Sequence, residues 1–329
     1  MKKLFIFITI LCLAAVFAGC KKSAEQPVSK ISVHGKKVFI VDSYHPEYIP
    51  NIMSRNSALK ILRPEGIEVR IFYLDSKNIT DENRLQKKAK QAVVQINQYK
   101  PDVILAFDDA ASKYVIMPYF RNSDIPVVFN GVNWDEKQYG YPYKNATGQV
   151  EVELLLELME TIKKYSKGIK IAMLTGDTET DRDSLKYYNN ILKVSFSEVR
   201  FVSDFDAWKK TFLEMQKTSD ALFLRNNPGI KDWNPSEAEL FVLENIKIIT
   251  ATVSTHLEDI SVISYAKDNS EFGEYSAQTA LDILNGKKPS EIPITRSQRA
   301  EIILNMKLAK KLGLIFPMEL IDQARFAGE

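Results

Sequence analysis

The chain has 329 residues, a formal net charge of +2 and 45% hydrophobic residues, so it is long enough for two ordinary lobes with separate cores. Basic and acidic residues number 44 and 42 and form no long basic block. This balance excludes the basic surface that nucleic-acid binding requires, and we expect no nucleic-acid partner.

The N-terminus carries an export signal. Lys2 and Lys3 precede an uncharged apolar run that ends at Phe17, and small residues then lead to Cys20. This pattern predicts a secretory signal peptide at 1–19, too short for a membrane span. A cysteine directly after Ala-Gly indicates a lipoprotein, with Cys20 as the lipidated mature N-terminus. An ordinary signal peptide with an incidental cysteine is the alternative.

The polar segment 20–35 predicts a flexible tether between the lipid and the folded domain. We therefore expect an exported protein, lipid-anchored to the cell membrane or the outer membrane and facing the periplasm or the cell exterior.

The sequence lacks the residues that metal sites and common catalytic sites need. Its only other cysteine, Cys12, lies in the predicted signal, which leaves no disulfide and no thiolate metal site. The three histidines are dispersed, and no nucleotide-binding loop or hydrolase motif is present. We expect no metal, no cofactor and no enzymatic activity.

Strands and helices alternate in the first half of the chain. Apolar runs predict strands at 38–42, 67–74, 103–107 and 126–129. Helical spacing of apolar residues predicts helices between them, from Ile49 to Leu62 and from a cap at Thr80 to Tyr99.

The same rhythm restarts in the second half. Strands are predicted at 169–174, 199–202, 221–224, 246–251 and 261–265. Helices are predicted at 152–162, 185–192, 205–215 and 270–285, and a further helix begins at the cap Asn234 with Pro235 in its first turn. The fold class is therefore α/β, with two doubly wound parallel-sheet lobes.

Polar residues follow the predicted strands, where open α/β sheets bind their ligands. The tip at 130–134 marks the exit from the first lobe, and we expect 130–150 to lead into a second sheet, with a ligand between the lobes. The candidate ligand-binding residues are Ser43, Tyr44, His45, Asp108, Asp109, Asn130, Asn133, Trp134, Tyr139, Thr175, Asp177, Thr178, Arg225, Asn226 and Asn227.

Several candidates have a structural alternative. Asp108 and Asp109 are suited to a ligand amine or hydroxyl, but one of them is equally expected to cap the following helix. Arg225 is suited to a carboxylate or to a hydroxyl-rich ligand, with an interlobe salt bridge as the alternative. His45 either lines the cleft or holds its own loop, and aromatic side chains such as Trp134 either stack on a flat ligand or belong to the core.

The remaining candidates have similar alternatives. The tip formed by Thr175, Asp177 and Thr178 either contacts the ligand or caps the next helix.

Several spaced motifs resemble the substrate-binding family of uncharacterised ABC-type transport systems, of type I periplasmic binding protein fold. The family also supplies extracytoplasmic sensing domains of signalling proteins. The motifs are Ser43-Tyr44-His45-Pro46, Phe107-Asp108-Asp109-Ala110, Val128 to Trp134, Glu271-Phe272-Gly273-Glu274, Ala280 to Gly286, Pro289 to Pro293, Leu304-Asn305 and Leu308 to Gly313.

The resemblance implies crossovers between the lobes. Lobe 1 would comprise 36–147 and 268–295, and lobe 2 would comprise 148–267 and 296–329. The hinge would then be three strands, near 147–150, 265–268 and 293–298, about which the lobes close on the ligand.

The favoured function is a lipid-anchored, monomeric receptor that delivers a small polar or aromatic solute to an ABC permease. An amino acid, in particular an aromatic one, is the expected solute. A receptor that docks on a sensor kinase or chemoreceptor is the alternative, and an enzyme on the same fold is a third hypothesis.

Overall fold

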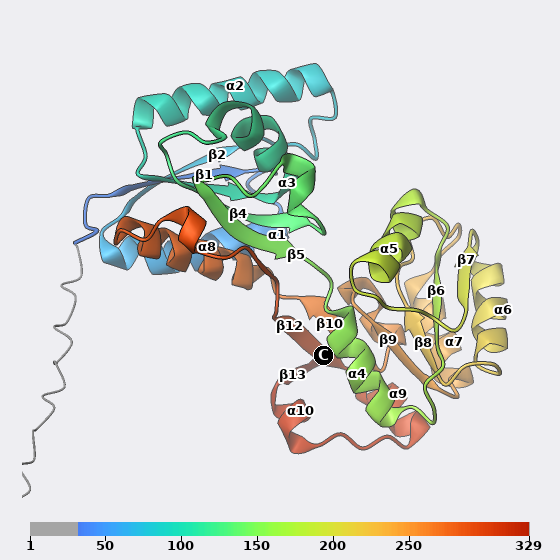
Figure 1. The fold of residues 1–329 in the computed structure, drawn as a ribbon. Coiled ribbons are helices and arrows are strands. Elements are labelled where there is room, and N and C mark those ends of the chain that lie inside the picture. Colours follow the sequence, from blue (N-terminus) through green and yellow to red (C-terminus); the bar gives the residue numbers. More distant parts are fainter. Residues whose placement is uncertain (1–31, 329) are drawn as a thin grey trace, which may run out of the picture. The chain divides into compact units, whose positions relative to one another are not determined.

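The computed structural model describes residues 32–328, which form two α/β sheets with helices on their faces (Figure 1). The predicted signal peptide, the lipidation site Cys20 and most of the tether lie outside the described residues. No helix within 32–328 is both long enough and apolar enough to cross a membrane. Val33 is buried in the core of the first sheet, so the folded domain begins slightly before residue 36.

The first sheet has the strand order β11-β5-β4-β3-β1-β2, and all its strand pairs are parallel. Its strands are β1 (Lys37–Asp42), β2 (Glu68–Tyr73), β3 (Val103–Phe107), β4 (Val127–Asn133), β5 (Ala146–Glu151) and β11 (Thr295–Arg296). The central strand β3 is apolar at every position because helices cover both faces of the sheet.

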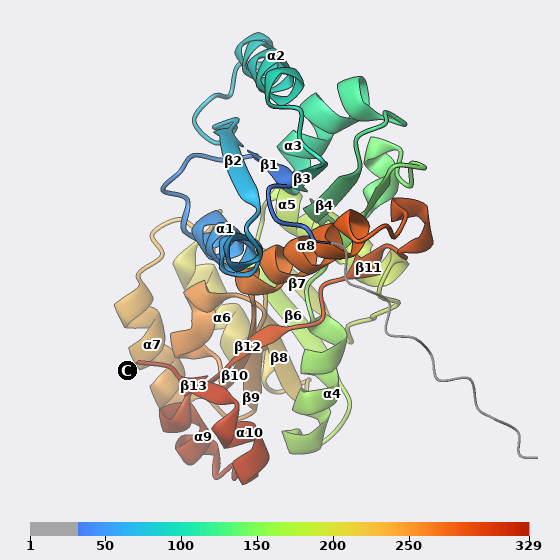
Figure 2. The same ribbon diagram turned by 90° about the vertical axis from the view of Figure 1, so that its left-hand side faces the viewer.

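Two helices cover each face of the first sheet. α2 (Glu82–Tyr99) and the π-helical segment η2 (Ser112–Phe120) pack on one face. α1 (Ile49–Leu62) and α8 (Asn269–Leu284) lie side by side on the other, although they are far apart in the sequence (Figures 1 and 2). A Cβ at Gly273 would lie 1.8 Å from the carbonyl oxygen of Ser54, so this close approach requires glycine.

The second sheet has the order β13-β12-β10-β9-β8-β6-β7, parallel except between β10 and β12. Its strands are β6 (Ile171–Gly176), β7 (Val199–Val202), β8 (Ala221–Leu224), β9 (Ile249–Thr252), β10 (Ile263–Lys267), β12 (Ala300–Leu304) and β13 (Ala324–Phe326). The helices around it are α4 (Leu155–Tyr165), α5 (Glu179–Asn190), α6 (Phe205–Met215), α7 (Pro235–Asn245), α9 (Met306–Leu312) and α10 (Met318–Asp322).

The chain passes between the sheets three times: after β5, after β10 and after β11. Two side chains tie these crossings together. The Ser297 hydroxyl donates to the carbonyl oxygen of Val152 and accepts from its N–H, at 2.9 and 3.0 Å. The Glu271 carboxylate, at the start of α8, accepts from the backbone N–H groups of Gln298 and Arg299 at 2.9 and 2.8 Å. The third crossing is therefore bonded to both of the others.

Most predicted elements are confirmed to within a few residues. The side chains that cap α7 and α2 show where these two helices begin. Asn234 caps α7 as predicted, because its side chain accepts from the Glu237 N–H at 3.2 Å. Thr80 does not cap α2. Asp81 does, by accepting from the Arg84 N–H at 2.8 Å.

The polar tip after the fourth strand was wrongly predicted as a loop that leads to a second sheet. β4 continues through it to Asn133, with a register shift against β5 at Gly131. β5 then adds to the first sheet rather than starting a second one. A polar segment can remain in a strand here because the parallel ladder to β5 satisfies its backbone.

Candidate functional site

A buried ion pair lies at the carboxyl end of β1. Arg55 of α1 places Nη1 2.5 Å from Oδ2 of Asp42, and both side chains are almost fully buried. Oδ1 of Asp42 accepts from Asn51 Nδ2 at 2.6 Å and from the Tyr44 N–H at 3.0 Å. Burial raises the pKa of Asp42, and these partners limit the rise. Asp42 thus fixes the start of the loop after β1.

Asp108 lies directly after β3, in the left-handed backbone region at φ +67°. Its Oδ2 accepts from Asn51 Nδ2 at 2.8 Å, so a single amide bridges two carboxylates. Within residues 32–328, Asp108 forms no ion pair. Burial, followed by the charge of Glu151, raises the pKa of Asp108 well above its ordinary value. The carboxylate is therefore held in place without an ion-pair partner in this part of the chain, and the charge of Lys267 offsets the rise in its pKa only in part.

Asp109, the next residue, is oriented by Asn133 of β4. It accepts from the Asn133 N–H at 3.2 Å and from Nδ2 at 2.5 Å. Neither aspartate caps the short α3 (Asp108–Ala111), which corrects one of the sequence-based alternatives. The cap is the hydroxyl of Ser43, which accepts from the Ala111 N–H at 2.8 Å. Ser43 is fully buried, and its hydroxyl bonds to the backbone around α3.

Aromatic rings flank the acidic pair. Tyr44 and Tyr48 pack edge to face, with their centroids 4.6 Å apart. The Nζ of Lys77 lies 4.6 Å from the first ring and 4.5 Å from the second. Burial, followed by the charges of Asp108 and Asp109, raises the pKa of Tyr44. His45 packs on the edge of Tyr48, and its Nδ1 is buried without a hydrogen-bond partner among the described residues.

Other candidates around β4 have partners within the protein. The buried side chain of Asn130 donates to Ser276 Oγ and to the Phe272 carbonyl oxygen, at 2.7 and 3.2 Å, and so links β4 to α8. Trp134 stacks on Tyr187 of α5, with centroids 5.1 Å apart. Tyr139 lies beside Asp109: burial and that carboxylate raise the pKa of its phenol.

Arg225 is the centre of a second buried network, at the carboxyl end of β8. Its Nη1 donates to Asp181 Oδ1 and its Nη2 to Ser184 Oγ, both at 2.6 Å, while Glu153 Oε1 lies 3.3 Å from Nη2. Asp181 is fully buried. Asp181 and Ser184 belong to α5, and Glu153 precedes α4, so all three partners pack around the second sheet. The network is therefore not the interlobe salt bridge that the sequence left open.

The remaining candidates after β6 and β8 are engaged locally or exposed. Thr178 caps α5 by accepting from the Asp181 N–H at 3.1 Å, the alternative foreseen for this tip. Asp177 pairs with the exposed Arg182 at 2.8 Å. Thr175 is fully buried, and its Oγ1 has no hydrogen-bond partner among the described residues.

Asn226 and Asn227 are half-buried and form a local turn, in which the Asn226 side chain accepts from the Asn227 N–H at 3.2 Å.

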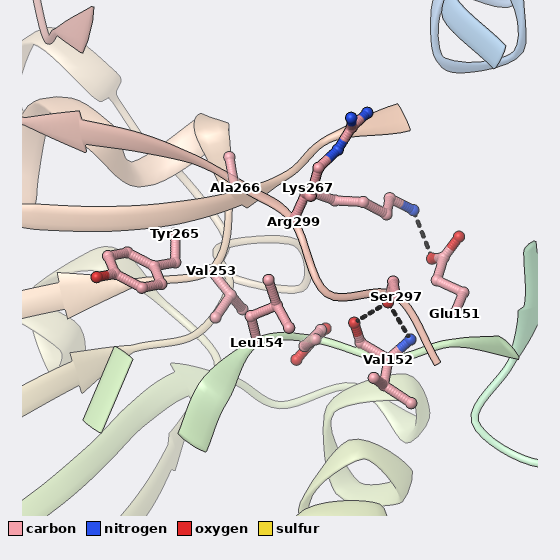
Figure 3. A pocket seen from close by; sticks show the side chains of 10 residues that line it. Glu151, Val152, Leu154, Val253, Tyr265, Ala266, Lys267, Ser297 and Arg299 are labelled. Carbon is pink, nitrogen blue, oxygen red and sulfur yellow. Dashed lines mark hydrogen bonds and ion pairs between the residues drawn. The ribbon is translucent and has the colours of Figure 1, made fainter. Parts of the chain in front are cut away.

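A cavity of about 180 Å³ lies where the three crossings meet (Figure 3). Its lining residues are Glu151, Val152, Glu153, Leu154, Val253, Tyr265, Ala266, Lys267, Ser297 and Arg299. Glu151 and Lys267 form an ion pair across it, and both act on the pKa of Asp108. Because the cavity is smaller than typical ligand pockets, it belongs to the hinge rather than to a complete ligand site.

No group of three or more His, Cys, Asp or Glu side chains within residues 32–328 is arranged to hold a metal ion. The family model described as ABC transporter substrate binding protein matches residues 55–326. The chain belongs to this family. Its members are binding proteins rather than enzymes, and they are typically extracytoplasmic.

Solved structures of other binding proteins share the fold at low sequence identity. A ligand-free, open substrate-binding protein with adhesive properties from Clostridium difficile is 18% identical, with a TM-score of 0.65 over 89% of this chain and 99% of its own. An ABC domain in complex with L-Trp from Streptococcus pneumonia is 15% identical, with a TM-score of 0.53 over 89% and 99%. A periplasmic ribose ABC transporter protein from Conexibacter woesei is 13% identical, with a TM-score of 0.53 over 86% and 97%. Comparison with curated proteins gives no match.

Sequence reasoning missed several residues that surround the acidic pair of this substrate-binding protein: Tyr48, Asn51, Lys77, Glu151 and Lys267. Only Asn51 offered a signal, because a buried polar side chain in the first turn of a helix needs a partner. The others lie in segments whose spacing gives no indication that they approach β3.

Proposed function

We propose that the chain is the solute receptor of an ABC transporter, anchored outside the cytoplasm through Cys20, and that its two lobes close on a small polar or aromatic solute. Asp108 carries the proposal. A carboxylate at the end of a buried parallel strand, with no cationic partner among residues 32–328, is suited to an amine or a hydroxyl of a ligand. The family supports the transporter context.

The lobes of this proposal are 36–147 with 268–295, and 148–267 with 296–329. The two sheets support this division, although β5 of the first sheet runs on to Glu151, past the proposed boundary at 147. The hinge consists of the segments near 147–150, 265–268 and 293–298. The bonds made by Ser297 and Glu271 support a hinge in which the three crossings bend as one unit.

The proposed ligand contacts are the candidates whose polar or aromatic groups are not fully used in bonds between the strands and helices of the protein. They are Tyr44, Asp108, Asp109 and Tyr139 on the first sheet and Asn226 and Asn227 on the second. The solved complex with L-Trp supports a small amine-bearing aromatic solute on this fold. Ser43, Asn130, Thr178 and Arg225 instead hold strands and helices together.

A thermal-shift screen of the full chain tests the function. The panel contains amino acids, amines, small carboxylates, sugars and purines. A solute that binds only the folded state adds about 2.7 kcal/mol of stability at a hundred times its dissociation constant. We expect a concentration-dependent shift that Asp108→Ala abolishes and that Asp206→Ala, which removes an exposed aspartate of α6, leaves intact. No shift with any compound would contradict a solute receptor.

A further inference from the structure

Near the carboxyl ends of the strands, some charged side chains form ion pairs and others do not. Among residues 32–328, the hydrogen bonds that Asp108 and Asp109 accept come from neutral groups, those of Asn51 and Asn133. Neither carboxylate has a cation within ion-pair distance in the described part of the chain. Two adjacent carboxylates without an ion-pair partner attract a positively charged group, because Lys267, which is itself paired with Glu151, offsets their repulsion and partial burial only in part.

The arginines and the hinge lysine of this region are already committed. Arg55 pairs with Asp42, and Lys267 pairs with Glu151. Arg225, the residue that the sequence offered for a ligand carboxylate, is held by Asp181 and Glu153. A ligand with a free carboxylate would have to break one of these pairs and leave a buried charge behind, which is costly.

The contact with Lys77 shows that the rings of Tyr44 and Tyr48 can bind an ammonium group. Its ammonium lies within 4.6 Å of the Tyr44 and Tyr48 ring centroids, which is cation–π geometry with both rings at once. Lys77 is itself an exposed residue on the loop after β2. The rings therefore form a place for an ammonium group close to Asp108, since the Tyr44 N–H bonds to Asp42 and the Asn51 amide bridges Asp42 to Asp108.

We propose that the solute is an organic cation, an amine without a free carboxylate, whose ammonium binds between the Asp108–Asp109 pair and the Tyr44–Tyr48 rings, and that Lys77 competes for those rings. The inference rests on the proposed receptor function and narrows its substrate class. It differs from the amino acid that the sequence favoured, because Arg55 and Arg225, the buried arginines near these strand ends, are already paired with Asp42 and Asp181.

Matched pairs of amine and amino acid test the charge requirement. The full chain is titrated by calorimetry with tyramine and tyrosine, tryptamine and tryptophan, putrescine and ornithine, and agmatine and arginine. Members of each pair differ by one carboxylate. We expect at least one amine to bind about tenfold or more tightly than its amino acid, because like charges placed together at a site are strongly unfavourable. Equal or tighter binding of the amino acids would overturn the inference.

Lys77→Gln tests whether Lys77 competes with the ligand for the Tyr44 and Tyr48 rings. The alternative, in which Lys77 binds a ligand carboxylate, predicts the opposite change in affinity. If Lys77 competes with the ligand ammonium, the variant binds the amine about fivefold more tightly, the size expected for release from an exposed cation–π contact. If Lys77 instead binds a ligand carboxylate, affinity falls. Lys88→Gln is the control, because it removes the same charge and a cation–π contact, with Phe72, away from the site.

The two proposals fail in different ways. Binding of sugars, purines or carboxylates by the wild-type chain, without binding of any amine, would overturn the organic-cation inference and leave the receptor function standing. No binding by any compound of either panel would contradict both.

Discussion

The carboxyl ends of the two sheets differ in how their charged groups are satisfied. At the second sheet, Arg225 and Asp181 are buried together and bonded to each other. At the first sheet, Asp108 has an amide as its hydrogen-bond partner and no ion-pair partner among residues 32–328. The sequence offered Asp108 and Arg225 as equivalent candidates. The difference teaches that a charged residue at a strand end is a stronger ligand candidate when the fold leaves it uncompensated.

Removal of Arg225 should have the largest effect on stability. Arg225→Ala leaves Asp181 buried without its cation, and we expect a loss of about 3–5 kcal/mol in the free energy of unfolding, measured by urea denaturation. Arg182→Ala breaks an exposed pair with Asp177 and should cost less than about 1 kcal/mol. Similar costs for the two variants would contradict the structural role of Arg225.

Asp108→Asn should have the largest effect on binding at the first sheet. The amide keeps the size of the side chain and can still accept from Asn51, but it lacks the charge. We expect a ligand amine to lose about tenfold to a hundredfold in affinity, since hydrogen bonds to charged groups contribute about 1.5–3 kcal/mol. Calorimetry measures the loss, and Asp206→Asn, at an exposed aspartate of α6, is the control. Unchanged affinity would remove Asp108 from the site.

The positions of strands could be predicted from the sequence, whereas the partners of charged side chains could not. β3 was placed correctly, because a strand that is buried on both faces is apolar at every position, and such a run can be recognised from consecutive residues. The partners of Arg225 were not, because Asp181 and Glu153 lie 44 and 72 residues away in the chain. Spacing carries no information about such contacts.

Local competition between caps shows the same limit at short range. The two aspartates after β3 are good cap residues by type, yet Ser43, 68 residues earlier, supplies the bond to the Ala111 N–H. A sequence pattern identifies residues able to cap a helix. Only the packing of β1 beside β3 decides that a serine from the neighbouring strand does so.

The pH dependence of Asp108 should distinguish the two sheets further. Its folded-state pKa is raised above the unfolded value by burial and by Glu151, so ionisation opposes folding. The resulting loss of stability begins as pH rises above the unfolded pKa and is complete above the folded pKa. Asp108→Asn removes this loss, and its stability advantage over wild type should grow from pH 4 towards neutral pH in urea titrations.

The same titration predicts that amine affinity rises with pH, because the proton must leave Asp108 before a cation binds. The nearby charged groups Glu151, Lys267 and Asp42 modify the steepness of this rise but not its sign. An affinity that falls with pH over the same range would contradict ion pairing between Asp108 and the ligand.

Thr175 offers the smallest and most selective test. Its hydroxyl is fully buried at the end of β6 without a hydrogen-bond partner among the described residues, so it opposes folding slightly unless a ligand uses it. Thr175→Val replaces that hydroxyl with a methyl group of similar size. We expect a gain of about 0.5–1 kcal/mol in urea denaturation and no change in amine affinity. A fall in affinity would instead extend the ligand site to the second sheet, because the hydroxyl would then be a ligand contact.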